Sequence, residues 1–228
     1  MGGARQKSIF YSAHPVILED HAVPNMKKII CFGDTITEMG LVVESRGYVA
    51  RLAERYIRRA DVLARGFSGY TTRDALSIVD RAVLAEQPQC VVLFFGASDS
   101  VLPDQFQHVP LDEYRNNMQE LATRIACSGA WLIFVTPPPA DEQKTLSRRM
   151  THTEQYALAC YEVALEMDIP VIDLFHLIQQ QSEWERKCLM DGIHLNAHGM
   201  DILYEALVAE LNKQMPLQSL PRLGMDGV

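Results

Sequence analysis

Short, uniformly apolar runs alternate along this chain with longer amphipathic segments, and this alternation limits the possible folds more than any other feature. The apolar runs are residues 28–32, 62–64, 90–95, 131–135 and 171–172. Strands that are buried on both faces of a parallel sheet have this continuous apolar character. Apolar residues recur at helical spacing over 47–59, 72–84, 111–126, 148–167 and 196–213. Strands and helices in alternation indicate βαβ units, and therefore an α/β fold with a parallel sheet covered by helices on both faces.

The chain is long enough for one domain with a full core. It has 228 residues, few for two domains, and shows no internal repeat. We expect an N-terminal extension over residues 1–26, one α/β domain over 27–213 and a C-terminal tail over 214–228. Neither end of the chain has apolar residues that recur at the regular spacing of a helix or a strand. Asn196 is the predicted N-cap of the last helix.

The charge balance argues against a nucleic-acid partner. The formal net charge is −8, whereas binding to phosphates requires a basic face. We expect no membrane span, because no apolar stretch reaches the roughly 18–20 residues that crossing a bilayer takes.

The five cysteines give no sign of a disulfide framework or a zinc site. They are Cys31, Cys90, Cys127, Cys160 and Cys188, an odd number without C-x-x-C spacing. Cys31 and Cys90 lie in or beside apolar runs, where a thiol usually acts as a small buried hydrophobe. The N-terminus has no signal-peptide pattern. We therefore expect a reducing, cytoplasmic location.

Polar and glycine-containing segments follow the predicted strands. They are Gly33-Asp34-Thr35 after the first strand, 65–70 after the second, 96–99 after the third and Asp191-Gly192-Ile193-His194 before the final helix. Ligands bind beyond the carboxyl ends of the strands in such sheets. Together the segments offer a hydroxyl, an imidazole, a carboxylate and backbone donors, which are the parts that nucleophilic acyl chemistry needs. The turn after the first strand lacks the phosphate cradle of a nucleotide or flavin binder.

In their order and residues, these segments resemble the SGNH (GDSL-type) hydrolases, and among them the isoamyl acetate-hydrolysing esterases. The matching segments are FGDTITE (32–38), RGFSGYTTR (65–73), FFGASDS (94–100), VPLDEYRNNM (109–118), TPPP (136–139) and DGIHLNAHG (191–199). They extend over roughly residues 28–212. The resemblance implies a three-layer α/β/α sandwich around a five-stranded parallel, flavodoxin-like sheet.

The resemblance also implies roles for individual residues. It places the nucleophile at Thr35, the general base at His194 and the carboxylate that orients the base at Asp191. The oxyanion hole consists of the backbone N–H groups of Thr35 and Gly69 and the side chain of Ser98. The implied activity is hydrolysis of small, acetate-type carboxylic esters through an acyl-enzyme, with a small-molecule ester as substrate and no metal or organic cofactor. The oligomeric state is left open.

The chain departs from the family pattern at Thr35, where the family has Ser, and at Ser98, where it has Asn. The extra methyl group of threonine restricts rotation about χ1. Loss of one oxyanion donor costs on the order of 10²–10³ in kcat. The two changes compensate if the smaller Ser98 makes room for the methyl group. The alternatives are a weakened or inactive SGNH-fold binding module, or a changed reaction such as acyl transfer.

Several other residues have two interpretations. Met39, Phe67, Phe95 and Met190 either line an acyl pocket or belong to the core. Four further histidines are expected to pack against helices or face solvent, without a role as metal ligands. They are His108, His152, His176 and His198.

Overall fold

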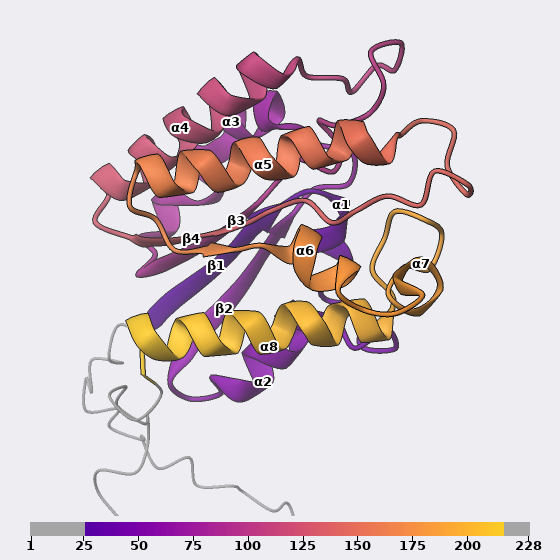
Figure 1. The fold of residues 1–228 in the computed structure, drawn as a ribbon. Coiled ribbons are helices and arrows are strands. Elements are labelled where there is room, and N and C mark those ends of the chain that lie inside the picture. Colours follow the sequence, from indigo (N-terminus) through magenta and orange to yellow (C-terminus); the bar gives the residue numbers. More distant parts are fainter. Residues whose placement is uncertain (1–25, 217–228) are drawn as a thin grey trace, which may run out of the picture.

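A five-stranded, all-parallel sheet forms the centre of the molecule (Figure 1). The computed structural model describes residues 26–216. The strands are β1 (Lys27–Gly33), β2 (Ala60–Gly66), β3 (Cys90–Phe94), β4 (Trp131–Val135) and β5 (Val171–Ile172), in the order β2-β1-β3-β4-β5. The predicted five-stranded parallel fold is confirmed. The predicted extension and most of the predicted tail lie outside the described residues.

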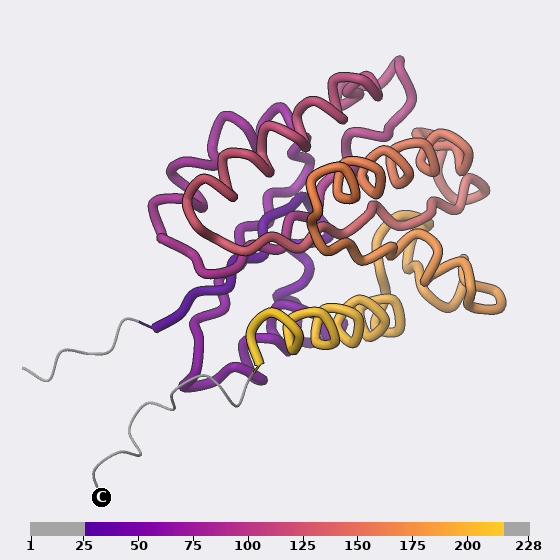
Figure 2. The backbone as a smooth tube through the Cα atoms, turned by 60° about the vertical axis from the view of Figure 1, so that its left-hand side comes forward, coloured from indigo at the N-terminus to yellow at the C-terminus, as the bar shows by residue number. Residues whose placement is uncertain are grey.

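Helices form a layer on each face of the sheet. They are α1 (Thr35–Met39), α2 (Tyr48–Arg55), α3 (Thr72–Ala82), α4 (Leu111–Cys127), α5 (Met150–Glu166), α6 (Leu174–Gln179), α7 (Trp184–Lys187) and α8 (Ala197–Gln214), with the 3₁₀ helix η1 (Leu84–Glu86). Figures 1 and 2 show α3, α4 and α5 on one face of the sheet and α2 and α8 on the other. Within the part of the chain that the structure describes, no helix is long and apolar enough to cross a bilayer.

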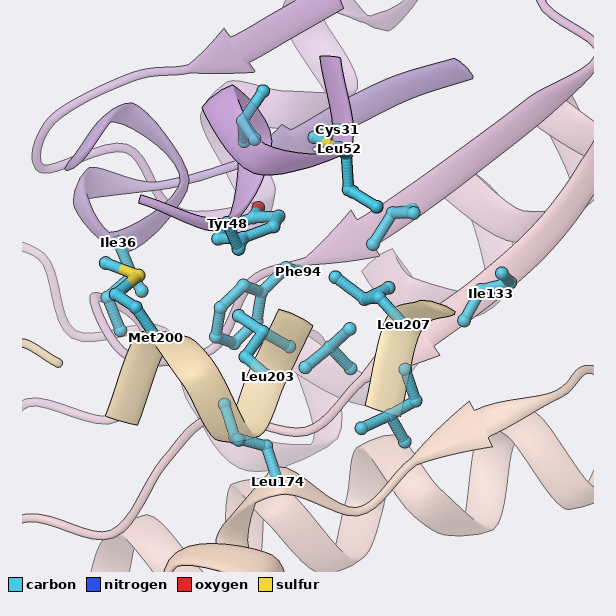
Figure 3. Close-up of a cluster of buried hydrophobic side chains, with 14 of the residues drawn as sticks. Cys31, Ile36, Tyr48, Leu52, Phe94, Ile133, Leu174, Met200, Leu203 and Leu207 are labelled. Atoms are coloured by element: carbon cyan, nitrogen blue, oxygen red, sulfur yellow. The ribbon is translucent and has the colours of Figure 1, made fainter. Parts of the chain in front are cut away.

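Strands β1, β3 and β4 bury side chains on both faces, which explains their apolar runs, whereas the edge strand β2 is only partly buried and contains Asp61 and Arg65. Ile29 and Cys31 on β1 point into the core beneath α2 and α8, whereas Ile30 and Phe32 point into the core beneath α3, α4 and α5. Figure 3 shows Leu203 and Leu207 of α8 in the first of these cores. Each fully buried side chain of this size contributes about 1.5–3 kcal/mol to folding through the hydrophobic effect.

The strands and long helices lie close to their predicted positions, but one helix is shorter than predicted and others were missed. The helix predicted over 47–59 ends at Arg55, because Arg58 adopts a left-handed backbone (φ 62°) that turns the chain into β2. Helices α1, α6 and α7 were not predicted. None of them exceeds six residues, so none presents a repeating apolar face.

The strand order places a topological switch point between β1 and β3. The chain leaves β1 for β2 on one side of it, and then returns to pair β3 on its other side. At such a point the connections diverge to opposite faces of the sheet and leave a crevice beyond the carboxyl ends of the strands. The turns after β1 and β3, which hold Thr35 and Ser98, border this crevice.

Candidate active site

The turn after β1 presents the hydroxyl group of Thr35 at the start of helix α1. Asp34 is the N-cap of this helix, and its carboxylate oxygen Oδ1 accepts a hydrogen bond from the backbone N–H of Ile36 at 2.9 Å. Gly33 permits the turn, because a Cβ atom there would lie 2.4 Å from the carbonyl oxygen of Phe94. Thr35 itself is half-buried.

The turn after β2 brings Gly69 to Thr35. Gly69 has a left-handed backbone (φ 75°), and its N–H donates to Oγ1 of Thr35 at 3.0 Å. The neighbouring N–H of Ser68 donates to Oε2 of Glu38 on α1 at 2.8 Å. Two adjacent N–H groups therefore attach this turn to the helix that carries Thr35.

The turn after β3 holds Ser98, whose side chain is buried at the edge of the crevice (6% exposed). The backbone N–H of Ser98 lies near the carboxylate of Asp34 and lowers its pKa. The carbonyl oxygen of Ala97, on the other side of the same peptide group, accepts two hydrogen bonds from Arg148. The turns after β1 and β3 are thus joined through Asp34.

Asp191 and His194 form a hydrogen-bonded pair within one loop. The imidazole Nδ1 lies 2.7 Å from Oδ2 of Asp191, while Oδ1 accepts the backbone N–H groups of Ile193 and His194 at 3.1 and 2.9 Å. Partial burial raises the pKa of Asp191, but the hydrogen bonds from His194 and Ile193 outweigh this effect and lower it below its usual value. An ionised carboxylate at Nδ1 assigns the proton to that nitrogen and leaves Nε2 as the basic atom.

Contacts on both sides fix the position of this loop. The N–H of Met190 donates to the carbonyl of His194 at 2.9 Å, and the N–H of Asp141 donates to the carbonyl of Gly192 at 2.8 Å. The side chain of Asn196 accepts the N–H groups of His198 and Gly199, which confirms Asn196 as the N-cap of α8.

Four of the five predicted site residues thus fall into two hydrogen-bonded pairs, and Ser98 belongs to neither. Thr35 is joined to Gly69, and His194 to Asp191; no hydrogen bond joins Thr35 to His194 among residues 26–216. Asp34 lies within electrostatic range of both pairs. Burial raises the pKa of its carboxyl group to about 6, although the positive charges of Arg148 and His194 act in the opposite direction. Because Oγ1 of Thr35 only accepts from Gly69, its own proton can pass to His194 once a hydrogen bond forms between Thr35 and His194.

Sequence reasoning assigned no role to Arg148 or to Asp99. Asp99 is fully buried and accepts the N–H and the hydroxyl of Thr72 on Oδ1, at 2.9 and 2.6 Å. Its other oxygen has no hydrogen-bond partner within residues 26–216, and burial raises the pKa of Asp99 to about 7. Asp99 follows Ser98 directly, so its position in the 96–99 segment was a usable signal. Arg148 precedes α5 in an irregular segment that carries no such signal.

The residues with two interpretations divide between core and surface. Phe95 is fully buried, Phe67 and Met39 pack against the two cores, and Met190 is 48% exposed.

Three of the other histidines within residues 26–216 pack or pair locally. His108 stacks on His152, and His176 contacts Asp173 with an Nδ1–Oδ2 distance of 2.7 Å. A cavity of about 680 Å³ lies beside this second Asp–His pair, along α5. Within residues 26–216 no cluster of three or more His, Cys, Asp or Glu side chains is arranged to hold a metal ion.

Comparison with known proteins identifies the family. The model of the GDSL-like lipase/acylhydrolase family matches residues 31–202. A GDSL esterase/lipase of Arabidopsis thaliana is 37% identical over 82% of this chain and 87% of its own. An isoamyl acetate-hydrolyzing esterase 1 homolog of Rattus norvegicus is 36% identical over 87% of this chain and 86% of its own.

Solved structures agree with this assignment. A lipase/acylhydrolase from Enterococcus faecalis superimposes with a TM-score of 0.72 at 27% identity, covering 86% of this chain and 98% of that one. An acetylxylan esterase from Geobacillus stearothermophilus shares the fold, with a TM-score of 0.68 at 23% identity over 81% of this chain and 94% of that one. With sequence motifs, fold and relatives in agreement, the chain belongs to the GDSL-like lipase/acylhydrolase family.

Proposed function

We propose that this protein is a carboxylic ester hydrolase in which Thr35 is the nucleophile, His194 the general base and Asp191 the carboxylate that orients the base. The observation that carries the proposal is the pairing of His194 with an ionised Asp191 near the crevice that displays the Thr35 hydroxyl. The names of its relatives, esterases and acylhydrolases, support the same reaction class.

In the first half of the reaction, Oγ1 of Thr35 attacks the acyl carbon of the ester and its proton passes to Nε2 of His194. The tetrahedral intermediate places a negative charge on the former carbonyl oxygen. The N–H groups of Thr35 and Gly69 and the hydroxyl of Ser98 stabilise this oxyanion. His194 then gives the proton to the departing alkoxide, so that an alcohol leaves and an ester of Thr35 remains.

In the second half, water attacks the acyl-threonine and His194 takes a proton from it. The second tetrahedral intermediate collapses, the carboxylic acid leaves, and the proton returns to Oγ1 of Thr35. Asp191 keeps its own charge throughout and stabilises the imidazolium that forms in each half. Every proton in this cycle is carried by a side chain of the protein, by water or by a product.

We propose small acetate-type esters as substrates. The supporting observations are the names of the relatives, which include isoamyl acetate-hydrolyzing esterase homologs and an acetylxylan esterase. The methyl group that threonine adds at the nucleophile also narrows the space beside the acyl carbon, which favours a short acyl chain.

Hydrolysis of p-nitrophenyl acetate and p-nitrophenyl butyrate by purified protein tests the proposal. Wild type should hydrolyse the acetate faster than the butyrate, and both Thr35→Ala and His194→Ala should lose at least about 100-fold of that rate. His176→Ala is a matched control, because it removes an imidazole with the same Asp–His contact outside the crevice. Full activity in Thr35→Ala rules Thr35 out as the nucleophile.

One observation favours a second candidate, a binding module with little or no turnover. The hydroxyl of Thr35 is bonded to Gly69 and not to His194, so the nucleophile is not poised for attack. In that case wild type and Thr35→Ser both bind an ester analogue without hydrolysing the ester, whereas activity that appears only in Thr35→Ser indicates an intact hydrolytic site switched off at one position. Silence of wild type and Thr35→Ser together with tight analogue binding selects the binding module.

A further inference from the structure

Arg148 is a half-buried cation beside the candidate site, and no carboxylate within residues 26–216 contacts it directly. Its guanidinium donates through Nε and Nη2 to the carbonyl oxygen of Ala97, at 3.1 and 2.7 Å, and through Nη1 to Oγ of Ser147 at 3.2 Å. It forms no ion pair with residues 26–216. Burial lowers the pKa of the guanidinium below its usual value, and the charges of Asp34 and Asp191 partly reverse this effect. Burial of a charge without an ion-pair partner is costly. The guanidinium of Arg148 is half-buried, and its three hydrogen bonds offset part of that cost.

Arg148 holds the Ala97–Ser98 peptide group, which borders the crevice, through its carbonyl oxygen. The carbonyl oxygen of the Ala97–Ser98 peptide accepts hydrogen bonds from Arg148, while its N–H lies near the carboxylate of Asp34. A trans peptide points its C=O and N–H in opposite directions, so a cation on one side and a carboxylate on the other hold it in one orientation. That orientation sets the direction in which the Ser98 side chain leaves the backbone.

The charges around the guanidinium indicate what it does. Asp34 precedes the proposed nucleophile, Asp191 orients the proposed base, and both are near enough to affect Arg148 electrostatically. During catalysis this region gains a negative oxyanion and a positive imidazolium. Asp191 contacts the imidazole of His194 directly, whereas Arg148 contacts the peptide group that leads into Ser98, a proposed donor to the oxyanion. A fixed cation beside a developing negative charge stabilises that charge through electrostatic attraction.

We infer that Arg148 is a positioning residue of the oxyanion hole, which orients the Ala97–Ser98 peptide and places a permanent positive charge beside the developing oxyanion. The inference rests on the proposed esterase function, because it takes Ser98 and Thr35 as parts of that site. It also accounts for the short side chain at position 98. Ser98 offers the oxyanion only a hydroxyl group, and the positive charge of Arg148 supplies part of the remaining stabilisation.

Kinetics of Arg148→Gln and Arg148→Lys with p-nitrophenyl acetate provide the first test. We expect Arg148→Gln to lower kcat by about 100-fold with KM changed less than about threefold, because the oxyanion exists only in the transition state and the intermediate. Arg148→Lys keeps the charge and should recover part of the loss. Arg124→Gln is the matched control, because Arg124 also donates to a backbone carbonyl, that of Leu76 at 3.0 Å, on the distant helix α4. A loss of thermal stability without a loss of kcat in Arg148→Gln overturns the inference.

A double-mutant cycle separates the positioning role from a general effect on the fold. Ser98→Asn adds an amide donor at the place where Arg148 is proposed to compensate. In that background Arg148→Gln should lower kcat by only about 10-fold, less than in wild type, since two groups that stabilise the same charge are not additive. Equal losses in both backgrounds contradict the shared role.

Binding of phenylboronic acid tests the inference even if wild type hydrolyses no ester. A boronic acid forms a tetrahedral anionic adduct with a hydroxyl nucleophile and so mimics the oxyanion, whereas acetophenone is a neutral ligand of similar size. We expect Arg148→Gln to weaken binding of the boronate by at least about 10-fold and to leave binding of acetophenone unchanged. Equal affinity of wild type and Arg148→Gln for the boronate, or failure of wild type to bind it, overturns the inference. A wild type that binds the boronate in this manner but hydrolyses no ester refutes the proposed function alone.

Discussion

The backbone N–H of Gly69 donates to the hydroxyl oxygen Oγ1 of Thr35 at 3.0 Å, so the proposed nucleophile is bonded to a proposed oxyanion-hole donor. The same N–H is needed by the oxyanion once an ester is attacked. Substrate binding must therefore break this hydrogen bond and turn the hydroxyl toward His194. The ease of that rotation governs how active the site is.

Thr35→Ser should raise kcat for p-nitrophenyl acetate by up to about 100-fold. Threonine has restricted rotamers because its methyl group must move whenever its hydroxyl moves, and misplacement of a reacting atom by about 1 Å costs roughly that factor. Serine carries no methyl group and turns freely. Steady-state kinetics of the two proteins check this expectation, with Thr123→Ser on the outer face of α4 as a control that should not change kcat. A lower kcat in Thr35→Ser indicates a site adapted to the methyl group.

Gly69→Ala should lower kcat by about 10- to 100-fold through a shift of the Gly69 N–H. Its backbone has φ 75°, where a side chain costs about 1–2 kcal/mol, although an added Cβ comes no closer than 3.4 Å to Gln107. Gly129 is a matched control, since it has φ 85° and an added Cβ meets nothing within 4 Å. Thermal melts should show similar destabilisation in Gly69→Ala and Gly129→Ala, while only the first loses activity. Equal activity of the two variants excludes Gly69 from the site.

Asp191→Asn should reduce kcat by about 10⁴-fold, because an amide no longer selects the Nδ1–H tautomer of His194 or stabilises its charged form. Asp173→Asn alters the same contact in the second Asp–His pair, at an identical Nδ1–Oδ2 distance of 2.7 Å. That variant should keep wild-type kcat and lose on the order of 1 kcal/mol of stability, since Asp173 caps α6. If Asp173→Asn lost activity as well, the hydrolytic site would have been assigned to the wrong pair.

Asp99→Asn should make thermal stability less dependent on pH. Burial raises the pKa of Asp99 from 3.8 to about 7, so the folded protein holds a proton that the unfolded chain releases above about pH 4. The free energy of unfolding therefore falls as pH rises between these values, by about 1.4 kcal/mol per pH unit for one such group. Melting temperatures of wild type should decline from pH 5 to pH 7 and those of Asp99→Asn should decline less. The remaining slope, up to about pH 6, belongs to Asp34. Parallel declines in the two proteins contradict the assignment to Asp99.

The sequence is informative about the sheet because its strands are buried on both faces. Ile29 to Phe32 contact helices on either side, so every position is apolar and the strand is visible without tertiary information. Apolar patterning does not reveal α1 and α6. Each is a helix of only one or two turns that is stabilised by its N-cap and by packing against the rest of the fold. Asp34 and Asp173 do cap them, but an Asp before an apolar residue is too common to predict a helix.

The candidate site is predictable only where its parts are local in sequence. The contact of Asp191 with His194 spans three residues and follows from the turn itself. The contact of Gly69 with Thr35 spans 34 residues and that of Arg148 with Ala97 spans 51, and both depend on how separate connections converge beyond the sheet. The family resemblance supplied Gly69, because its motif is part of the pattern. Neither spacing nor motif pointed to Arg148.

The second Asp–His pair has a consequence for how such sites originate. Asp173 and His176 reproduce the arrangement of Asp191 and His194, including the hydrogen bond from the backbone N–H of the histidine to the aspartate. This second pair lies directly after β5, beside the cavity along α5. Four consecutive residues are thus enough to build an oriented imidazole, and such an element can arise at any suitable turn. The scarce components of a hydrolase are the hydroxyl and the donors that several strands must bring together. In this architecture a short turn can produce a second Asp–His pair, whereas the crevice between β1 and β3 depends on the whole sheet and occurs once.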